Sequence, residues 1–158
     1  MNGLGRTCGG PDPSALHCPE ITPESPQISL ISTCKGHTKL ITSVAFSANN
    51  ALVASGSYDK AVIIWDARTG KKLLMLTGHR TAVESVAFSR DSKLVASGSD
   101  DDTIKIWDAM TGGIKKTLEG HTHTIRPVAF SDNGRLVVSG SDDRLGFGIG
   151  QQAQCCRL

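Results

Sequence analysis

The sequence lacks any long apolar run, and this shortage narrows where the protein can reside. No stretch reaches the ~18 consecutive apolar residues that a membrane-spanning helix needs. The first residues also lack the charged-then-apolar order of a secretory signal. These absences exclude a membrane span and a signal of that kind, and we expect the protein in the cytoplasm or the nucleus.

Blocks of like charge are missing as well. The 17 basic and 15 acidic residues are mixed along the chain, and the formal net charge is +2. Nucleic acids and anionic membranes are bound through concentrated basic surfaces. The sequence therefore predicts neither as a partner.

Cysteine pairs with metal-ligand spacing are absent. The five cysteines are odd in number and contain no CxxC motif, so they fit neither a disulfide framework nor a zinc site. The acidic runs at 100–102 and 142–143 lack the alternating ligands and terminal Glu of a calcium loop. The ending Cys155-Cys156-Arg157-Leu158 lacks the aliphatic residues of a prenylation box. The sequence predicts no metal and no cofactor.

What the sequence does have is an internal repeat of 42 residues. Gly36-His37 recurs as Gly78-His79 and Gly120-His121, and Trp65-Asp66 recurs as Trp107-Asp108. Residues 36–77 and 78–119 are identical at 21 of 42 positions without a gap. A fixed period of this length indicates a repeat architecture.

Each repeat reads as four short strands. In the first unit, 41–47, 52–57, 61–66 and 71–76 are rich in Val, Ile and Leu and are separated by turn residues such as Asn49-Asn50 and Thr69-Gly70. Antiparallel hairpins fit such short loops. The fold class is therefore expected to be all-β.

A Gly-His opening, a Trp-Asp near the end and a period near 42 resemble the WD repeat (WD40 type), over residues 30–143. The resemblance is greatest to the near-identical arrays of fungal NACHT/WD-repeat proteins. It implies an open, partial β-propeller, in which each unit is roughly one four-stranded blade and an outer strand is shared with a neighbouring blade. The expected organisation is an irregular segment at 1–29, blades at 36–77 and 78–119, a partial blade at 120–143 and a disordered non-repeat tail at 144–158.

Histidine, serine and aspartate recur together in each unit, which raises the question of a hydrolase triad. Catalysis needs one activated nucleophile in one pocket, whereas a constellation copied at fixed spacing is what a repeating architecture requires. The resemblance implies that these residues and the tryptophan form a buried hydrogen-bonded chain in each blade, so no enzyme is predicted. The expected structural tetrads, the last without its tryptophan, are His37, Ser55, Asp59 and Trp65; His79, Ser97, Asp101 and Trp107; and His121, Ser139 and Asp143.

Positions that differ between units are where a repeat protein varies its surface. The resemblance places three such positions of each unit on one rim of the blades. Tyr58 and Arg126 among them belong to residue types that often anchor interfaces. The candidate partner-binding residues are Leu40, Thr42, Tyr58, Ala82, Glu84, Asp100, Thr124, Arg126 and Asp142.

The predicted function is a scaffold that binds another protein, whose identity the sequence does not specify. An array of fewer than three blades cannot close into a ring, so self-association through its open blade faces is also expected. The resemblance to the fungal arrays implies recognition of self or nonself, although no nucleotide-binding module is present in this sequence.

The alternative is a truncated or frameshifted fragment of a larger WD-repeat protein. The period calls for a third Trp-Asp pair where Ile149 and Gly150 stand. Suitable codons for Phe147 and Gly148, read one frame along, restore that pair. A shifted frame or an unusual splice is therefore the first interpretation of the tail, and a natural divergent cap is the second.

Overall fold

The computed structural model describes residues 30, 32–143 and 152–158, and every regular element in them is a β-strand. The predicted N-terminal segment at 1–29 and the proposed frame change at 147–148 lie outside these residues. In the described part of the chain, no helix has the length and apolarity needed to cross a membrane.

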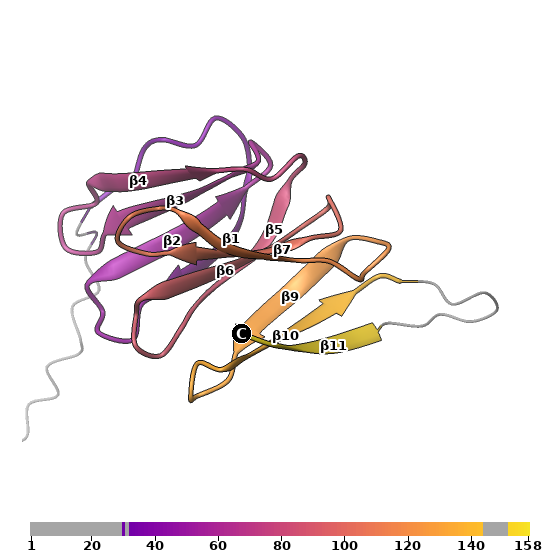
Figure 1. Cartoon of the computed structure of the whole chain (residues 1–158). Helices are drawn as coiled ribbons and strands as arrows, with labels where there is room; N and C mark the ends of the chain where they lie inside the picture. The colour runs from indigo at the N-terminus through magenta and orange to yellow at the C-terminus, as the bar shows by residue number, and fades with distance from the viewer. Residues whose placement is uncertain (1–29, 31, 144–151) are drawn as a thin grey trace, which may run out of the picture.

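The first two repeat units each form one four-stranded antiparallel sheet in which consecutive strands are neighbours (Figure 1). Their strands are β1 (Ile41–Phe46), β2 (Leu52–Ser57), β3 (Ala61–Asp66) and β4 (Lys72–Thr77) in the first sheet, and β5 (Val83–Phe88), β6 (Leu94–Ser99), β7 (Ile104–Asp108) and β8 (Ile114–Leu118) in the second. The all-β expectation and the four strands per unit are confirmed.

The third sheet has three strands, in the order β11-β10-β9. β9 (Ile125–Phe130) and β10 (Leu136–Ser141) continue the repeat, and β11 (Gln152–Arg157) comes from the tail. The three sheets form an open array that does not close into a ring (Figure 1).

The prediction of a disordered tail is wrong for residues 152–157. β11 pairs antiparallel with β10 over six residue pairs, from Leu136 with Arg157 to Ser141 with Gln152. The exposed edge of β10 offers unpaired amide and carbonyl groups, and an extended segment satisfies them whatever its side chains are. Cys156 lies opposite Val137 as Trp65 lies opposite Val53 in the first sheet.

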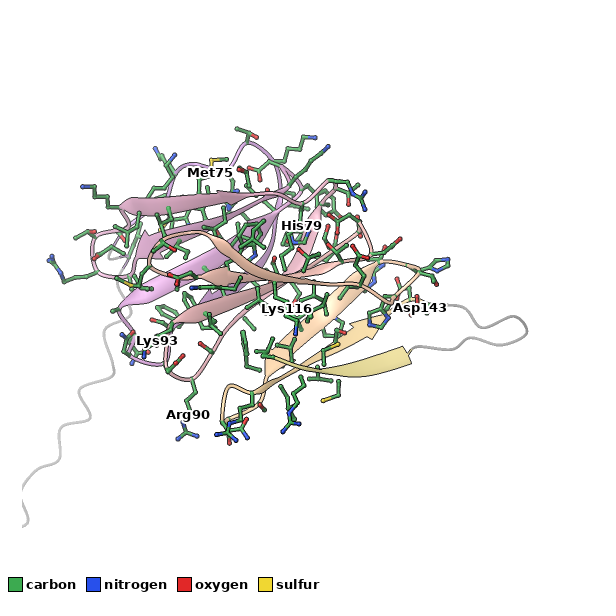
Figure 2. The ribbon with its side chains drawn as sticks, in the orientation of Figure 1. Met75, His79, Arg90, Lys93, Lys116 and Asp143 are labelled. Atoms are coloured by element: carbon green, nitrogen blue, oxygen red, sulfur yellow. The ribbon has the colours of Figure 1, made fainter. Side chains whose placement is uncertain are left out.

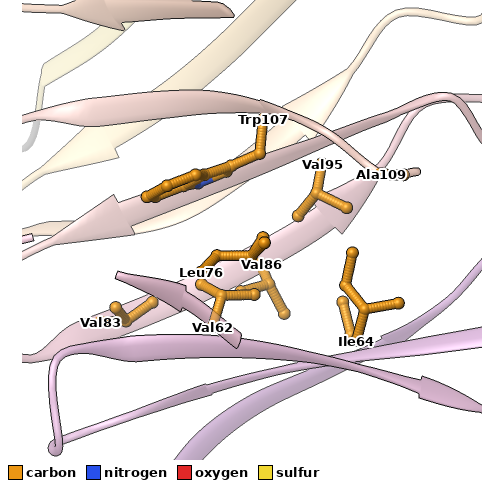
Figure 3. Packing of buried hydrophobic residues seen from close by; sticks show 9 residues of the cluster. Val62, Ile64, Leu76, Val83, Val86, Val95, Trp107 and Ala109 are labelled. Atoms are coloured by element: carbon orange, nitrogen blue, oxygen red, sulfur yellow. The ribbon is translucent and has the colours of Figure 1, made fainter. Parts of the chain in front are cut away.

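The apolar core lies between successive sheets. One cluster joins Val62, Ile64 and Leu76 of the first sheet to Val86 and Trp107 of the second (Figure 3). A second cluster joins the second sheet to the third through residues that include Ile106, Ile125 and Val137. Each sheet is thus held chiefly by the faces of its neighbours, as expected of stacked repeat units.

Candidate functional site

The second sheet contains the complete polar tetrad. His79 Nδ1 lies 3.0 Å from Asp101 Oδ2, His79 Nε2 lies 2.7 Å from Ser97 Oγ, and Trp107 Nε1 donates to that hydroxyl at 2.8 Å. All four residues are buried. The chain of bonds ties β6 and β7 to the loop that precedes β5, because each member comes from a different one of these segments or their turns.

The other two sheets repeat the arrangement. In the first, His37 contacts Asp59 at 2.9 Å and Ser55 at 2.7 Å, and Trp65 Nε1 donates to Ser55 Oγ at 2.8 Å. In the third, His121 contacts Asp143 at 2.6 Å and Ser139 at 2.9 Å. The third unit lacks an indole donor because β11 carries Cys156 in the position of the tryptophan.

Asp59 and Asp101 also organise the turn before the third strand of their sheets. Asp101 Oδ1 accepts the amide of Thr103 at 3.1 Å and its hydroxyl at 2.6 Å, while Oδ2 accepts the amide of Arg80 at 2.8 Å. The hydroxyl of Thr103 is a member that the sequence reasoning missed. The buried Ser97 hydroxyl, fixed by His79 and Trp107, fits a structural link between strands rather than an accessible nucleophile.

These contacts shift proton equilibria in the second sheet. Burial raises the pKa of Asp101, but hydrogen bonds from Thr103, Arg80 and His79 outweigh it and lower the pKa to about 2. Burial lowers the pKa of His79, and the adjacent Asp101 opposes that shift only in part. His79 is therefore neutral in the folded protein over a range in which an unfolded histidine is already charged.

Mild acid is therefore expected to destabilise the protein through His79. The unfolded chain takes up a proton as the pH falls below the ordinary histidine pKa of 6.5, while the folded chain does not until its lowered pKa is reached. Stability contributed by His79 is full above pH 6.5 and is lost as the pH falls toward the folded pKa. Urea denaturation at several pH values between 8 and 5 gives the free energy of unfolding as a function of pH. Its decrease toward pH 5 should be smaller in His79→Asn and unchanged in His123→Gln, a change at a half-exposed histidine. An unchanged decrease in His79→Asn would contradict the assignment.

The nine candidate partner-binding positions lie at one end of the strands. Backbone hydrogen bonds pair Tyr58 with Leu40, Asp100 with Ala82 and Asp142 with Thr124, at 3.0, 3.0 and 3.1 Å. The same corner of each sheet is therefore built alike. Figure 2 shows His79 and Asp143 toward this end and Arg90 and Lys93 toward the opposite end.

Five of these residues interact across the three sheets, and we call them the rim cluster: Tyr58, Glu84, Asp100, Arg126 and Asp142. Arg126 Nε donates to Asp142 Oδ2 at 2.8 Å. Burial and the charge of Asp100 raise the pKa of Glu84, and Arg126 and a hydrogen bond from Tyr58 act against that rise. The cluster thus combines one aromatic ring, three carboxylates and one guanidinium at this end of the strands.

The other four candidate positions differ in their accessibility. Leu40 is exposed, whereas Ala82 and Thr124 are half-buried. The Thr42 hydroxyl is directed into the structure, where it donates to the carbonyls of Gly56 and Val83. The structure therefore places Leu40 beside the rim cluster and removes the Thr42 hydroxyl from the accessible surface.

Metal binding finds no support in the described residues. No group of three or more His, Cys, Asp or Glu side chains there is arranged to hold a metal ion. Both carboxylate oxygens of Asp101, the central residue of the acidic run, already accept hydrogen bonds from Thr103, His79 and Arg80.

Comparison with known families gives one match that covers most of the chain. The model of the WD domain, G-beta repeat, matches residues 28–66, 70–108 and 112–145. The second and third matches begin before an outer strand, so β4 opens the second match although it lies in the first sheet, and β8 opens the third although it lies in the second. This is the shared outer strand that the sequence resemblance implies.

Individual relatives match shorter stretches. Protein Mut11 of Chlamydomonas reinhardtii is 50% identical over 38 residues, which is 24% of this chain and 10% of that protein. Small ribosomal subunit protein RACK1z of Arabidopsis thaliana is 47% identical over 47 residues, 30% of this chain and 14% of that protein. Ribosome biogenesis protein YTM1 of Scheffersomyces stipitis is 41% identical over 63 residues, 39% of this chain and 13% of that protein. The chain thus spans a small part of each relative's length.

Among solved structures, U3-55K superimposes with a TM-score of 0.67 and 29% sequence identity. The match covers 70% of this chain and 36% of that structure.

Proposed function

The chain belongs to the WD domain, G-beta repeat family, and from this premise we propose that it binds another protein through the rim cluster. WD repeats indicate a protein-interaction scaffold. The observation that carries the finer proposal is the position of the cluster. Side chains that differ from unit to unit lie together at the surface, near the histidine, serine and aspartate that recur in every unit.

The chemistry of the cluster suits a polar protein segment. Tyr58 is 43% exposed and offers an aromatic face with a hydroxyl, and Arg126 offers a planar guanidinium. Glu84, Asp100 and Asp142 give the surface an acidic balance. We therefore expect a partner segment with at least one basic side chain to lie against these residues.

Two further elements belong to this proposal. The names of two relatives place them in a ribosomal subunit and in ribosome biogenesis, which is compatible with a cytoplasmic or nuclear location. The resemblance to fungal NACHT/WD-repeat arrays supports a role in recognition of self or nonself. Self-association through the open sheet faces is proposed as a second interaction.

Peptides selected for binding to the chain from a displayed library are expected to lose affinity at least tenfold when Arg126 or Tyr58 is replaced by alanine. A tenfold loss corresponds to about 1.4 kcal/mol, within the range of an interface anchor. Arg90→Ala is the matched control, because Arg90 is also an exposed arginine facing an aspartate, Asp132, at the opposite end of the strands. Titration calorimetry with purified variants measures the difference.

Two outcomes would contradict the proposal. Selected peptides that bind all three variants equally would show that the rim cluster is not the binding surface. A chain that yields no binders at all would favour the alternative of a fragment without independent function.

A further inference from the structure

The first sheet presents an apolar face that its counterparts in the other sheets bury. Ile41, Val44 and Phe46 are 46%, 66% and 66% exposed. The equivalents of Ile41 and Val44 42 residues later, Val83 and Val86, are 0% and 5% exposed, because they pack on the first sheet. Phe88, the equivalent of Phe46, is partly buried against the same cluster. We call this side of each sheet, which faces the start of the chain, the leading face, and the opposite side the trailing face.

Inside the chain, a trailing face receives a leading face twice with the same geometry. A Cβ atom added to Gly56 would lie 2.7 Å from Val83 Cγ1, and one added to Gly98 would lie 2.8 Å from Ile125 Cγ2. Glycine at these positions lets the next sheet approach closely.

A hydrogen bond accompanies each of these contacts between sheets. Ser43 Oγ accepts the amide of Val86 at 3.2 Å, and Ser85 Oγ accepts the amide of Val128 at 3.3 Å. Backbone amides that the stacking removes from water are thereby satisfied.

The trailing face of the third sheet is open. Val138 is 43% exposed, and a shallow apolar hollow is lined by Pro127, Val128, Ala129, Val138, Ser139 and Gly140. Among the described sheets, the leading face of the first and the trailing face of the third are therefore uncovered.

We propose that a second copy of this chain docks head to tail, with its leading face at Ile41, Val44 and Phe46 on the trailing face at Val138 and Gly140. The inference rests on the proposed self-association and names the surfaces that carry it. The two uncovered faces are those that pack together inside the chain, and the exposed side chains are of the types that the two internal interfaces bury. Such an interface is heterologous, so one copy can bind a partner at each end.

The third sheet departs from the other two in ways that weaken this contact. Pro127 stands where Ser43 and Ser85 accept an amide from the next sheet, and a proline ring offers no such acceptor. Val138 stands where Ala54 and Ala96 lie buried, so the surface is also less recessed. The amide of Val44 in a docked copy would be left unpaired, which costs binding free energy.

Four variants of the full chain test the inference by sedimentation over a concentration series. Val44→Asp spoils only the leading face, and Val138→Asp spoils only the trailing face, so each alone is expected to stay monomeric where the unchanged chain associates. Mixed in equal amounts they retain one good face each and should form a one-to-one pair. Met110→Asp, a change at an exposed side chain on a turn, should associate like the unchanged chain.

Pro127→Ser supplies an independent measurement, because it adds the missing acceptor without removing apolar surface. It is expected to tighten self-association at least tenfold. The inference is overturned if Val138→Asp associates as readily as the unchanged chain, if the mixture forms no pair, or if Pro127→Ser has no effect. An unchanged chain that remains monomeric at every concentration would instead remove the proposed self-association itself, and would leave binding at the rim cluster untouched.

Discussion

Replacing Trp107 by alanine is expected to lower the free energy of unfolding by about 3 to 5 kcal/mol. The indole is 1% exposed and lies in the cluster that joins the first sheet to the second (Figure 3). Its removal opens a cavity between sheets and also takes the Nε1 donor from Ser97. A loss of this size approaches the whole stability of many domains.

Two further variants separate packing from hydrogen bonding at this position. Trp107→Phe keeps an aromatic ring but loses the N–H group, and is expected to cost about 1 to 3 kcal/mol. Met110→Ala, at a side chain that is 74% exposed, should change stability by less than about 0.5 kcal/mol. Urea denaturation gives the change in the free energy of unfolding for each of the three variants, provided that its dependence on urea concentration is the same in all of them. Equal midpoint shifts for Trp107→Ala and Met110→Ala would show that the sheet interface contributes little.

The strands were predictable because their determinants are local. Leu52–Ser57 and Ala61–Asp66 begin and end as the sequence predicts, while β1 ends one residue earlier than expected and β4 is shifted by one residue, to Lys72–Thr77. Short segments rich in Val, Ile and Leu, bounded by turn residues, mark these strands without reference to the rest of the chain. The copied spacing showed which side chains recur together, and the resemblance to the WD repeat implied that they form the tetrads.

Contacts between sheets were not predictable in the same way. The bonds from Val86 to Ser43 and from Val128 to Ser85 depend on how one sheet stacks on the next, and no rule of local sequence gives that geometry. In the sequence, these contacts are indicated only by one equivalent position of the three repeats, which is serine at 43 and 85 and proline at 127.

The prediction of disorder in the tail was wrong at residues 152–157 for a related reason. Its residues show no strand alternation, so the sequence indicated disorder, yet residues 152–157 pair with β10. An open sheet edge recruits backbone, and backbone pairing is nearly independent of side-chain pattern. At the rim, the resemblance to the WD repeat identified individual positions but no contacts between them. Only the structure shows that Arg126 contacts Asp142 and that Glu84 lies near charged neighbours.

Asp101→Ala is expected to lower the free energy of unfolding by about 2 to 4 kcal/mol, far more than a change at the adjacent acidic residue. Asp101 accepts four hydrogen bonds, from His79, from the amide of Arg80, and from the amide and hydroxyl of Thr103. Its loss leaves these donors buried without an acceptor. Desolvated groups without a partner cost more than the bonds contribute when formed.

The matched control is Asp102→Asn, since Asp102 has a φ of 63° and asparagine tolerates that left-handed backbone better than alanine. The first repeat carries Lys60 at the same position with a φ of 73°, so no carboxylate is required there. The Asp101 contribution also has a pH signature. Because the folded pKa of about 2 lies below the ordinary value of 3.8, the stabilisation is complete above pH 3.8 and is lost as the pH falls through 2. Denaturation midpoints that shift equally in Asp101→Ala and Asp102→Asn, or a difference between them that does not shrink in this acidic range, would contradict the role of Asp101 in holding the turn.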